Sequence, residues 1–361
     1  MRVLFAAARP CYPLFLGGAE ISAHETLLAL GRSGHECRAL GQVTAGLDDL
    51  SDWMAAHRAD AAVLRRPIPG HAEPLVERCE VTLDVGYRVL LTLHADFVGC
   101  VRRTLAEFRP DLVLTQLDGS EAVAHAALRH GARVLHTVRD LNNPHNFLPF
   151  LSGRTRGAGM TVLANSEYVR ARLRERWGVE AAVLYPAVDV GRFRPPAPGG
   201  GAAVMVNPVR SKGGEIVRHL IKGLPDQPFV LVEGWSRLRP DDWPYPNARL
   251  VRRRHDIEVV LAEATVVLVP SQEEEGFGRV VVEGQAAGVP VLCSRHSGLI
   301  ESHGDGDGMV AEYREPAAWL EALTAVLRDP IRRADMCRHG RANCHRFTRE
   351  RHGRALEARL S

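Results

Sequence analysis

The sequence predicts an α/β protein of two doubly wound domains, each with a parallel sheet covered by helices on both faces. The chain has 361 residues, more than the roughly 250–300 at which single hydrophobic cores usually stop growing. Short apolar runs alternate with helical patterns in both halves, as in parallel sheets. Prolines and glycines crowd residues 186–201, a composition that no regular element tolerates. We therefore expect two domains joined by a linker.

In the first half, apolar runs predict buried strands and amphipathic segments predict helices. The strands are expected at 2–8, 110–116 and 132–138, and the helices at 19–36 and 119–131. In the second half, four more apolar runs predict strands at 202–208, 228–234, 264–271 and 289–294. The segment 278–287 is valine-rich, but its length and the following Gly288 favour a helix.

These elements place the domain boundaries. The first domain is expected over 1–186, the linker or hinge over 187–201, and the second domain over 202–345. The last segment, 346–361, is expected to form a helix that returns to the first domain.

Composition limits the function classes. A net charge of +3, from 46 basic and 43 acidic residues, is too small to make nucleic acid the expected partner. Seven scattered cysteines without a C-x-x-C spacing argue against a disulfide framework or a zinc ribbon. No apolar run approaches the ~20 residues of a membrane-spanning helix. A cytoplasmic protein is expected, with peripheral contact to the inner face of a membrane left open.

Ligands of doubly wound sheets bind beyond the carboxyl ends of the strands, so the loops that follow the apolar runs are the candidate sites. They span 9–18, 139–146, 164–168, 207–214 and 271–279.

The loop 271–279 combines glycines with carboxylates. Gly276 and Gly278 precede the predicted helix, whose free N–H groups and dipole favour an anion such as a diphosphate. Glu275 and Glu283 flank them, and acids cannot favourably contact a diphosphate, so they are expected to face hydroxyl groups. A sugar nucleotide carries both kinds of group. The alternative is that Glu283 is a solvated helix residue and Glu275 part of an exposed acidic loop.

Two other loops agree with an anionic ligand. Arg210 and Lys212 follow the first strand of the second domain and precede a glycine pair, where cations would neutralise a leaving diphosphate. Gly17 and Gly18 form a second pair at the start of the first helix and permit close backbone approach across a cleft. A solvated basic turn is the alternative for Arg210 and Lys212.

At this point the chain resembles the family-four retaining glycosyltransferases of the GT-B fold, in which two Rossmann-like domains face each other across a cleft. The resemblance runs through most of the chain, and its most specific stretch is "VPSQEEEGFGRVVVEGQAAGVPVLCS" (269–294). The other matching motifs are "GGAE" (17–20), "RPDLVLTQ" (109–116), "ANSEYVRARL" (164–173), "LYPAVDVGRFRP" (184–195), "KGG" (212–214) and "SGLIE" (297–301).

The resemblance implies an enzyme that transfers a hexose-type sugar from a nucleoside diphosphate, most often UDP, to an acceptor hydroxyl with retention of configuration. It implies no cofactor and no metal. Glu283 would bind the ribose, Glu275 the sugar, and Lys212 the diphosphate. The remaining donor contacts would come from Gly17, Gly18, Asn207, Arg210, Gly276, Phe277 and Gly278.

Two departures from the family pattern bear on the site. Asn207 occupies the general place of a family arginine, and Arg210 is a candidate substitute. Where many members have a histidine near the reacting sugar, this chain has Arg139, which we take as the third catalytic candidate. His136 is expected to be a buried strand residue. Asp140 and Asn142 are the candidate acceptor-facing residues.

Several interpretations stay open at this stage. Asp305 and Asp307 resemble a metal motif but lie in a polar turn, and Trp235 either stacks on the donor base or packs. The basic helix 166–178 either touches an anionic surface or is solvated. The acceptor, whether a small molecule, a lipid-linked group or a saccharide, would contact variable loops at 9–16, 66–100 and 139–157. A catalytically silent donor-binding subunit and a nucleotide-sugar epimerase are the alternative functions.

Overall fold

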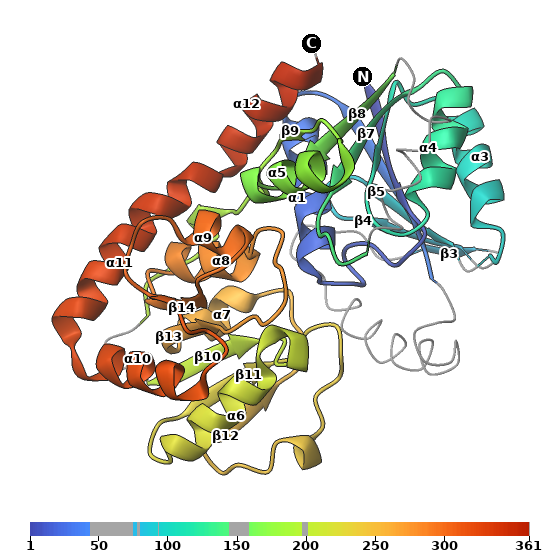
Figure 1. Ribbon diagram of the computed structural model, residues 1–361. Coiled ribbons are helices and arrows are strands. Elements are labelled where there is room, and N and C mark those ends of the chain that lie inside the picture. The colour runs from blue at the N-terminus through green and yellow to red at the C-terminus, as the bar shows by residue number, and fades with distance from the viewer. Residues whose placement is uncertain (44–74, 78–79, 93, 144–158, 197–200, 361) are drawn as a thin grey trace.

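The structure is a computed structural model that describes the chain except residues 44–74, 78–79, 93, 144–158, 197–200 and 361. Two α/β units are present, one built on a nine-stranded sheet and the other on a six-stranded sheet. Figure 1 shows the first unit in blue to green and the second in yellow to orange. The prediction of two α/β domains, each built on a parallel sheet, is confirmed.

The first sheet has the order β3-β4-β5-β2-β1-β6-β7-β8-β9. Its strands are β1 (Arg2–Ala7), β2 (Glu36–Gln42), β3 (Leu75–Glu77), β4 (Glu80–Asp84), β5 (Arg88–Thr92), β6 (Leu112–Thr115), β7 (Arg133–Val138), β8 (Met160–Ala164) and β9 (Ala182–Val183). All neighbours are parallel except β4, which pairs antiparallel with β3 and β5. Variable loops were expected over 66–100, and this expectation was wrong for the residues of that range that the structure describes. Short strands that alternate polar and apolar residues escape a search for continuous apolar runs.

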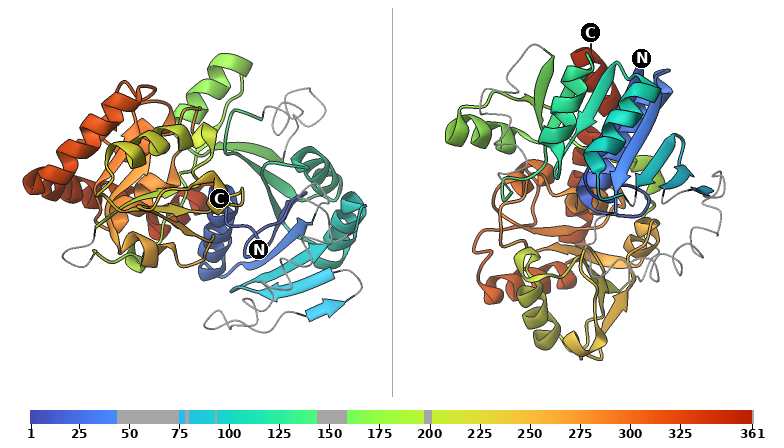
Figure 2. Two further views of the ribbon diagram at one scale, coloured as in Figure 1. Left: turned by 90° about the horizontal axis from the view of Figure 1, so that it is seen from below. Right: turned by 90° about the vertical axis from the view of Figure 1, so that its right-hand side faces the viewer.

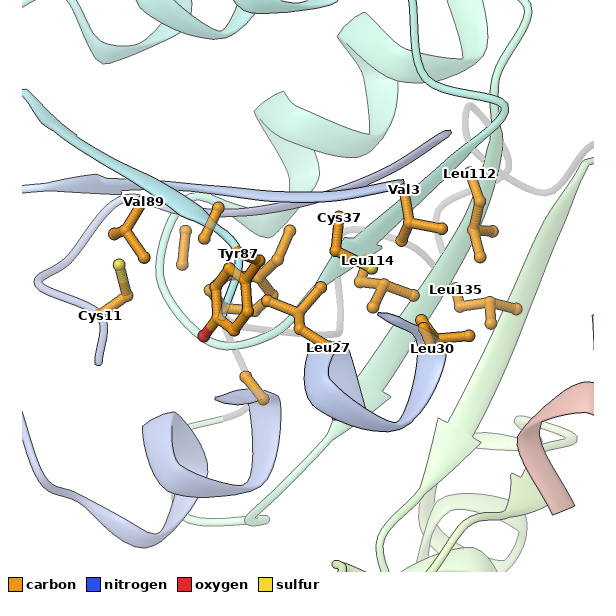
Figure 3. Close-up of a cluster of buried hydrophobic side chains, with 14 of the residues drawn as sticks. Val3, Cys11, Leu27, Leu30, Cys37, Tyr87, Val89, Leu112, Leu114 and Leu135 are labelled. Carbon is orange, nitrogen blue, oxygen red and sulfur yellow. The ribbon is translucent and has the colours of Figure 1, made fainter. Parts of the chain in front are cut away.

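Helices cover both faces of this sheet. Two of them, α1 (Gly18–Arg32) and α12 (Arg349–Leu360), pack on one face, and α3 (Phe97–Phe108), α4 (Ser120–Arg129) and α5 (Glu167–Trp177) pack on the other. The alternation along β1 explains the two cores, because Val3 faces α1 while Leu4 faces the opposite helices. Figure 3 shows Leu27 and Leu30 of α1 directed toward the strands, in the core that contains Val3.

The second sheet has the order β12-β11-β10-β13-β14-β15, with every pair parallel. Its strands are β10 (Ala202–Val206), β11 (Phe229–Val232), β12 (Ala248–Val251), β13 (Ala264–Val269), β14 (Val291–Ser294) and β15 (Met309–Val310). Its helices are α6 (Gly214–Gly223), α7 (Ile257–Leu261), α8 (Arg279–Ala286), α9 (Gly298–His303), α10 (Pro316–Arg328) and α11 (Pro330–Cys344). The fully buried Trp319 of α10 packs with α6 on one face, while α7, α8 and α9 pack on the other.

Both sheets reverse their strand order at one point, and these points locate the site. In the first sheet the reversal lies between β1 and β6, and in the second between β10 and β13. The chain segments that leave these strands include the glycine pair Gly17–Gly18, Lys212 and the loop 271–278. Ligands of doubly wound sheets bind at such reversals, so topology brings most of the predicted loops to one region.

The C-terminal segment joins the two units. The helices α11 and α12 run along both of them, in red in Figure 1 and Figure 2, and α12 packs against α1. Arg349, at the start of α12, pairs with Glu25 of α1 and with Asp189 after the last strand of the first sheet. Val188 also bridges to Thr348. The C-terminal segment therefore holds the chain in place where it crosses from the first unit to the second.

The valine-rich segment for which a helix was predicted over a strand is a helix. α8 spans Arg279–Ala286 within the expected 278–287, and Gly288 follows with a φ of 68°. A left-handed glycine is a common helix stop. Among the residues that the structure describes, no helix is long and apolar enough to cross a membrane.

Candidate active site

The glycines of the loop before α8 let the two units approach closely. Gly278 has a φ of 85° and is the N-terminal cap of α8. A Cβ added to Gly276 would lie 2.0 Å from the carbonyl oxygen of Arg139, which belongs to the first unit. Ser166 of the first unit also donates a hydrogen bond to the Gly276 carbonyl. The loop thus lies directly against Arg139, and a side chain at Gly276 would separate them.

Phe277 lies between these glycines, but its side chain points into the protein. The ring is 3% exposed and packs against Tyr185 and Phe347, with ring centroids 6.0 Å and 4.9 Å away. Only its backbone is available to a ligand, which is the contact that the family resemblance implies for this residue.

Glu275 forms a charge pair with Lys212. Its Oε1 lies 2.6 Å from Lys212 Nζ and also accepts a hydrogen bond from the Ser271 hydroxyl. Burial raises the pKa of Glu275, but the Lys212 ammonium and these hydrogen bonds outweigh it and hold the pKa below its ordinary value. With a side chain 15% exposed, Glu275 is not part of a solvated acidic loop. It is an ionised carboxylate inside the site.

Glu283 is paired in a different way. Its Oε1 lies 2.8 Å from Nε of Arg279, one helical turn earlier, and the two side chains are 8% and 10% exposed. Burial raises the pKa of Glu283, and Arg279 offsets the rise only in part. The alternative of a solvated helix glutamate is therefore wrong. The residue lies one turn into α8, on the side where α8 meets the first unit.

In the loop after β10, Asn207 and its candidate substitute Arg210 have different surroundings. Asn207 is buried, has a φ of 59°, and packs so closely on Gly234 that a Cβ there would lie 2.3 Å from its Oδ1. Arg210 is exposed and makes no ion pair within the described part of the chain. Asn207 therefore shapes the loop, and Arg210 is an exposed cation two residues before Lys212.

On the first unit, Arg139 is held by a neutral partner. Its Nε donates to Oε1 of Gln116 at 2.8 Å. Burial lowers the pKa of Arg139 to about 10, while the charge of Glu20 opposes that shift. Arginine remains charged at neutral pH even so. His136 is buried in β7, where Thr115 Oγ1 lies 2.9 Å from its Nδ1 and burial lowers its pKa to about 3. The prediction of a buried strand histidine is confirmed.

The glycine pair of the first unit rests on a buried carboxylate. A Cβ on Gly17 would lie 2.3 Å from Oε2 of Glu20, so a larger residue there would displace this side chain. Glu20 is 3% exposed and its Oε1 lies 3.0 Å from Nε of Arg9. Burial raises the pKa of Glu20, and Arg9 offsets only part of the rise. Arg9 also pairs with Asp118 at 3.2 Å, which ties the loop after β1 to the loop after β6.

The candidate acceptor-facing residues lie at the contact between the units. Asp140 accepts backbone N–H groups from Asn142 and Asn143, both at 3.2 Å, which folds the loop after β7. Asn142 donates to the carbonyl of Glu274 at 3.2 Å. The side chain of Glu274 accepts from Tyr168 at 2.7 Å and from Arg176 at 2.8 Å. The loop that carries Glu275 is therefore held from the first unit.

The basic helix and the aspartate motif have ordinary partners. The arginines of α5 each meet a carboxylate, as in the pairs Arg170–Glu167, Arg172–Glu175, Arg174–Glu180 and Arg176–Glu274. Asp307 pairs with Arg332 at 2.6 Å. Among the described residues, no group of three or more His, Cys, Asp or Glu side chains is placed to hold a metal ion.

Three contributors to this site were not predicted from the sequence. Gln116 directly follows the strand β6, so a search of every strand end would have found it. Glu274 is one of three consecutive glutamates, and nothing local distinguishes the one that reaches the first unit from the one that pairs with Lys212. Arg279 was quoted within a motif, but its contacts with Ala187 and with Gly18 lie outside α8.

Solved structures share this arrangement of two facing units. Sucrose-phosphate synthase from Thermosynechococcus elongatus matches with a TM-score of 0.75 at 16% sequence identity, covering 100% of this chain and 98% of that chain. Anabaena HepE in complex with UDP-glucose matches with a TM-score of 0.72 at 17% identity, covering 100% and 99%. At this level of identity the likeness defines the fold, and the fold is GT-B.

Sequence comparison identifies the family. The model of Glycosyltransferase Family 4 matches residues 16–192, and the model of glycosyl transferases group 1 matches residues 250–343. A D-inositol 3-phosphate glycosyltransferase from Xylanimonas cellulosilytica is 27% identical over 367 residues, covering 83% of this chain and 86% of the relative. The enzyme of the same name from Acidothermus cellulolyticus is 40% identical over 105 residues, covering 29% and 21%. The chain belongs to the family-four glycosyltransferases, and it is a glycosyltransferase enzyme.

Proposed function

We propose that the enzyme transfers a hexose from a nucleoside diphosphate hexose to an acceptor hydroxyl, with retention of anomeric configuration and without a metal ion. A UDP-hexose is the first donor to test, since the HepE structures with this fold contain UDP and UDP-glucose. The observation that carries the proposal is the pair of buried carboxylates, Glu275 and Glu283, on either side of a glycine-lined helix terminus.

Charge supports this division of roles. The N-terminus of α8 and the side chains of Lys212 and Arg210 supply positive charge for the diphosphate. Glu275 is ionised and accepts hydrogen bonds from Lys212 and Ser271. A hexose hydroxyl would add a further hydrogen bond to Glu275, and Glu283 would accept from the ribose hydroxyls. Arg139 faces the same loop from the opposite unit.

In the proposed reaction, the bond between the anomeric carbon and the β-phosphate oxygen breaks, and the acceptor oxygen bonds to that carbon on the same face. The acceptor hydroxyl gives its proton to an oxygen of the departing diphosphate. Lys212 and Arg139 would stabilise the negative charge that develops there, a role that a metal ion fills in other transferases. Contact between the units across Gly276 would exclude water, which limits hydrolysis of the donor.

The test has a binding part and a turnover part. Calorimetric titration with UDP-glucose, UDP-N-acetylglucosamine and GDP-mannose identifies the donor. Release of nucleoside diphosphate is then followed with an acceptor panel that starts with D-inositol 3-phosphate, the compound in the relatives' name. We expect turnover to persist in EDTA, and we expect NMR of the product to show the donor's anomeric configuration. Inverted product or loss of turnover in EDTA would refute those parts of the proposal, and binding without turnover across the panel would favour the silent subunit.

A variant locates the ribose contact. Replacing Glu283 by glutamine removes a buried charged acceptor, and we expect donor affinity to fall about tenfold or more. Glu321→Gln, at an exposed position of α10, is the matched control and should leave the affinity unchanged. Equal affinities for the two variants would remove Glu283 from the donor site.

A further inference from the structure

Arg279 connects three parts of the molecule that the proposed donor site needs together. Its Nε lies 2.8 Å from Oε1 of Glu283. Its guanidinium also donates a hydrogen bond to the carbonyl of Ala187, at the start of the segment between the two units. The aliphatic stem of Arg279 lies against the first unit, because a Cβ on Gly18 would be 3.9 Å from both its Cβ and its Cδ.

The same guanidinium also acts electrostatically on the first unit. Glu25 of α1 is buried, which raises its pKa, but hydrogen bonds from Arg349 and the charge of Arg279 lower it below the ordinary value. Arg279 thus pairs with Glu283 and acts electrostatically on Glu25 of the other unit. Its position depends on both units and on the crossing segment.

The pair leaves Glu283 able to accept further hydrogen bonds. An ionised carboxylate has about four lone-pair sites, and the 2.8 Å contact of Arg279 Nε is with Oε1. Without Arg279, a carboxylate as buried as Glu283 would shift toward its protonated form, since burial already raises its pKa. A protonated glutamate accepts fewer hydrogen bonds from a vicinal diol.

We propose that Arg279 is a positioning residue that holds Glu283 oriented toward the donor ribose and ties it to Ala187 and Gly18; this rests on the proposed function. Recognition of the ribose is then coupled to the closed arrangement of the two units. Arg279 itself need not touch the donor.

The experiment compares UDP with 2′,3′-dideoxy-UDP, which lacks the two ribose hydroxyls. Calorimetry gives both dissociation constants for the wild type, Arg279→Gln and Arg279→Lys. We expect UDP affinity to fall about tenfold or more in Arg279→Gln, as for loss of a charged hydrogen bond, with little change for the dideoxy compound. The ratio of the dissociation constant of the dideoxy compound to that of UDP should therefore fall toward one. Arg279→Lys, which keeps the charge, should recover part of the wild-type ratio.

Arg328→Gln, at an exposed position of α10, is the control and should retain both affinities. If Arg279→Gln weakens both nucleotides equally, Arg279 only supports the fold and the inference is overturned. Thermal unfolding without nucleotide checks that each variant folds, and Arg279→Lys carries the test if Arg279→Gln does not. A wild type that binds none of UDP, GDP and ADP would overturn the proposed function itself, and this inference with it.

Discussion

The two halves of the site hold their charged groups in opposite ways. In the second unit, each candidate carboxylate has a cation within 2.8 Å, Lys212 for Glu275 and Arg279 for Glu283. In the first unit, Arg139 is bonded to the neutral amide of Gln116. The second unit thus presents compensated pairs, whereas in the first unit no carboxylate among the described residues forms an ion pair with Arg139.

This difference suggests how the work of the reaction is divided. Lys212 holds the pKa of Glu275 below its ordinary value, whereas Arg279 offsets only part of the rise that burial causes in the pKa of Glu283. Carboxylates with a cation beside them suit the recognition of hydroxyl groups. An arginine held by an amide keeps its full charge for an incoming anion. We infer that the second unit recognises the donor and that the first adds charge at the reacting phosphate.

The largest effect is expected from Lys212→Ala, which breaks the pairing of the second unit. The variant loses the cation proposed for the leaving diphosphate, and kcat should fall about 100- to 1000-fold, as for loss of one preorganised donor. Steady-state rates at saturating donor provide the measurement. Lys222→Ala, at an exposed position of α6, should keep the wild-type rate. A Lys212→Ala enzyme with more than half of that rate would show that the catalytic charge lies elsewhere.

A smaller effect is expected from Arg139→Gln, which removes the charge of the first unit. We expect kcat to fall about tenfold, by the loss of one charged hydrogen bond in the transition state, with a smaller change in donor affinity. Arg129→Gln, at an exposed position of α4, is the control. A drop in donor affinity with unchanged kcat would contradict the division of labour, because it would make Arg139 a binding residue.

The smallest effect is expected from Trp235→Ala. Trp235 is 50% exposed, and its ring centroid lies 5.3 Å from Nζ of Lys212, so it borders the donor site and contributes little to the core. Stacking on the nucleotide base predicts a two- to tenfold loss of UDP affinity, roughly the worth of an aromatic pair. Trp235→Phe should restore most of it. A lower unfolding temperature with unchanged affinity would instead assign Trp235 to packing.

Much of the second unit could be predicted from the sequence because its signals are local. Pro270, Gly276, Gly278 and Gly288 delimit one loop and one helix, and α8 begins and ends within a residue of the prediction. The carboxylates Glu275 and Glu283 belong to the same contiguous stretch. The partner of Glu275 was less accessible, because Lys212 is 63 residues away in sequence.

The first unit was harder to predict because its contributions come from separate strand ends. Gln116 follows β6 and Arg139 follows β7, and their contact depends on the adjacency of these two strands. The antiparallel strands β3, β4 and β5 lie where loops were expected. Short half-polar strands take their stability from the strands they pair with, and β5 pairs with the distant β2, so local pattern underestimates them.

The sequence by itself determined the two-domain α/β class, the family, and the candidate residues Glu275, Glu283 and Lys212, because apolar periodicity, glycine positions and contiguous motifs are local properties. Only the tertiary structure decided which charges from separate segments meet. The ion pairs of Glu275 and Glu274 and the contact of Gly276 with Arg139 all depend on strand order or on the packing of one unit against the other. Those arrangements follow from burial summed over the whole chain, which no single segment encodes.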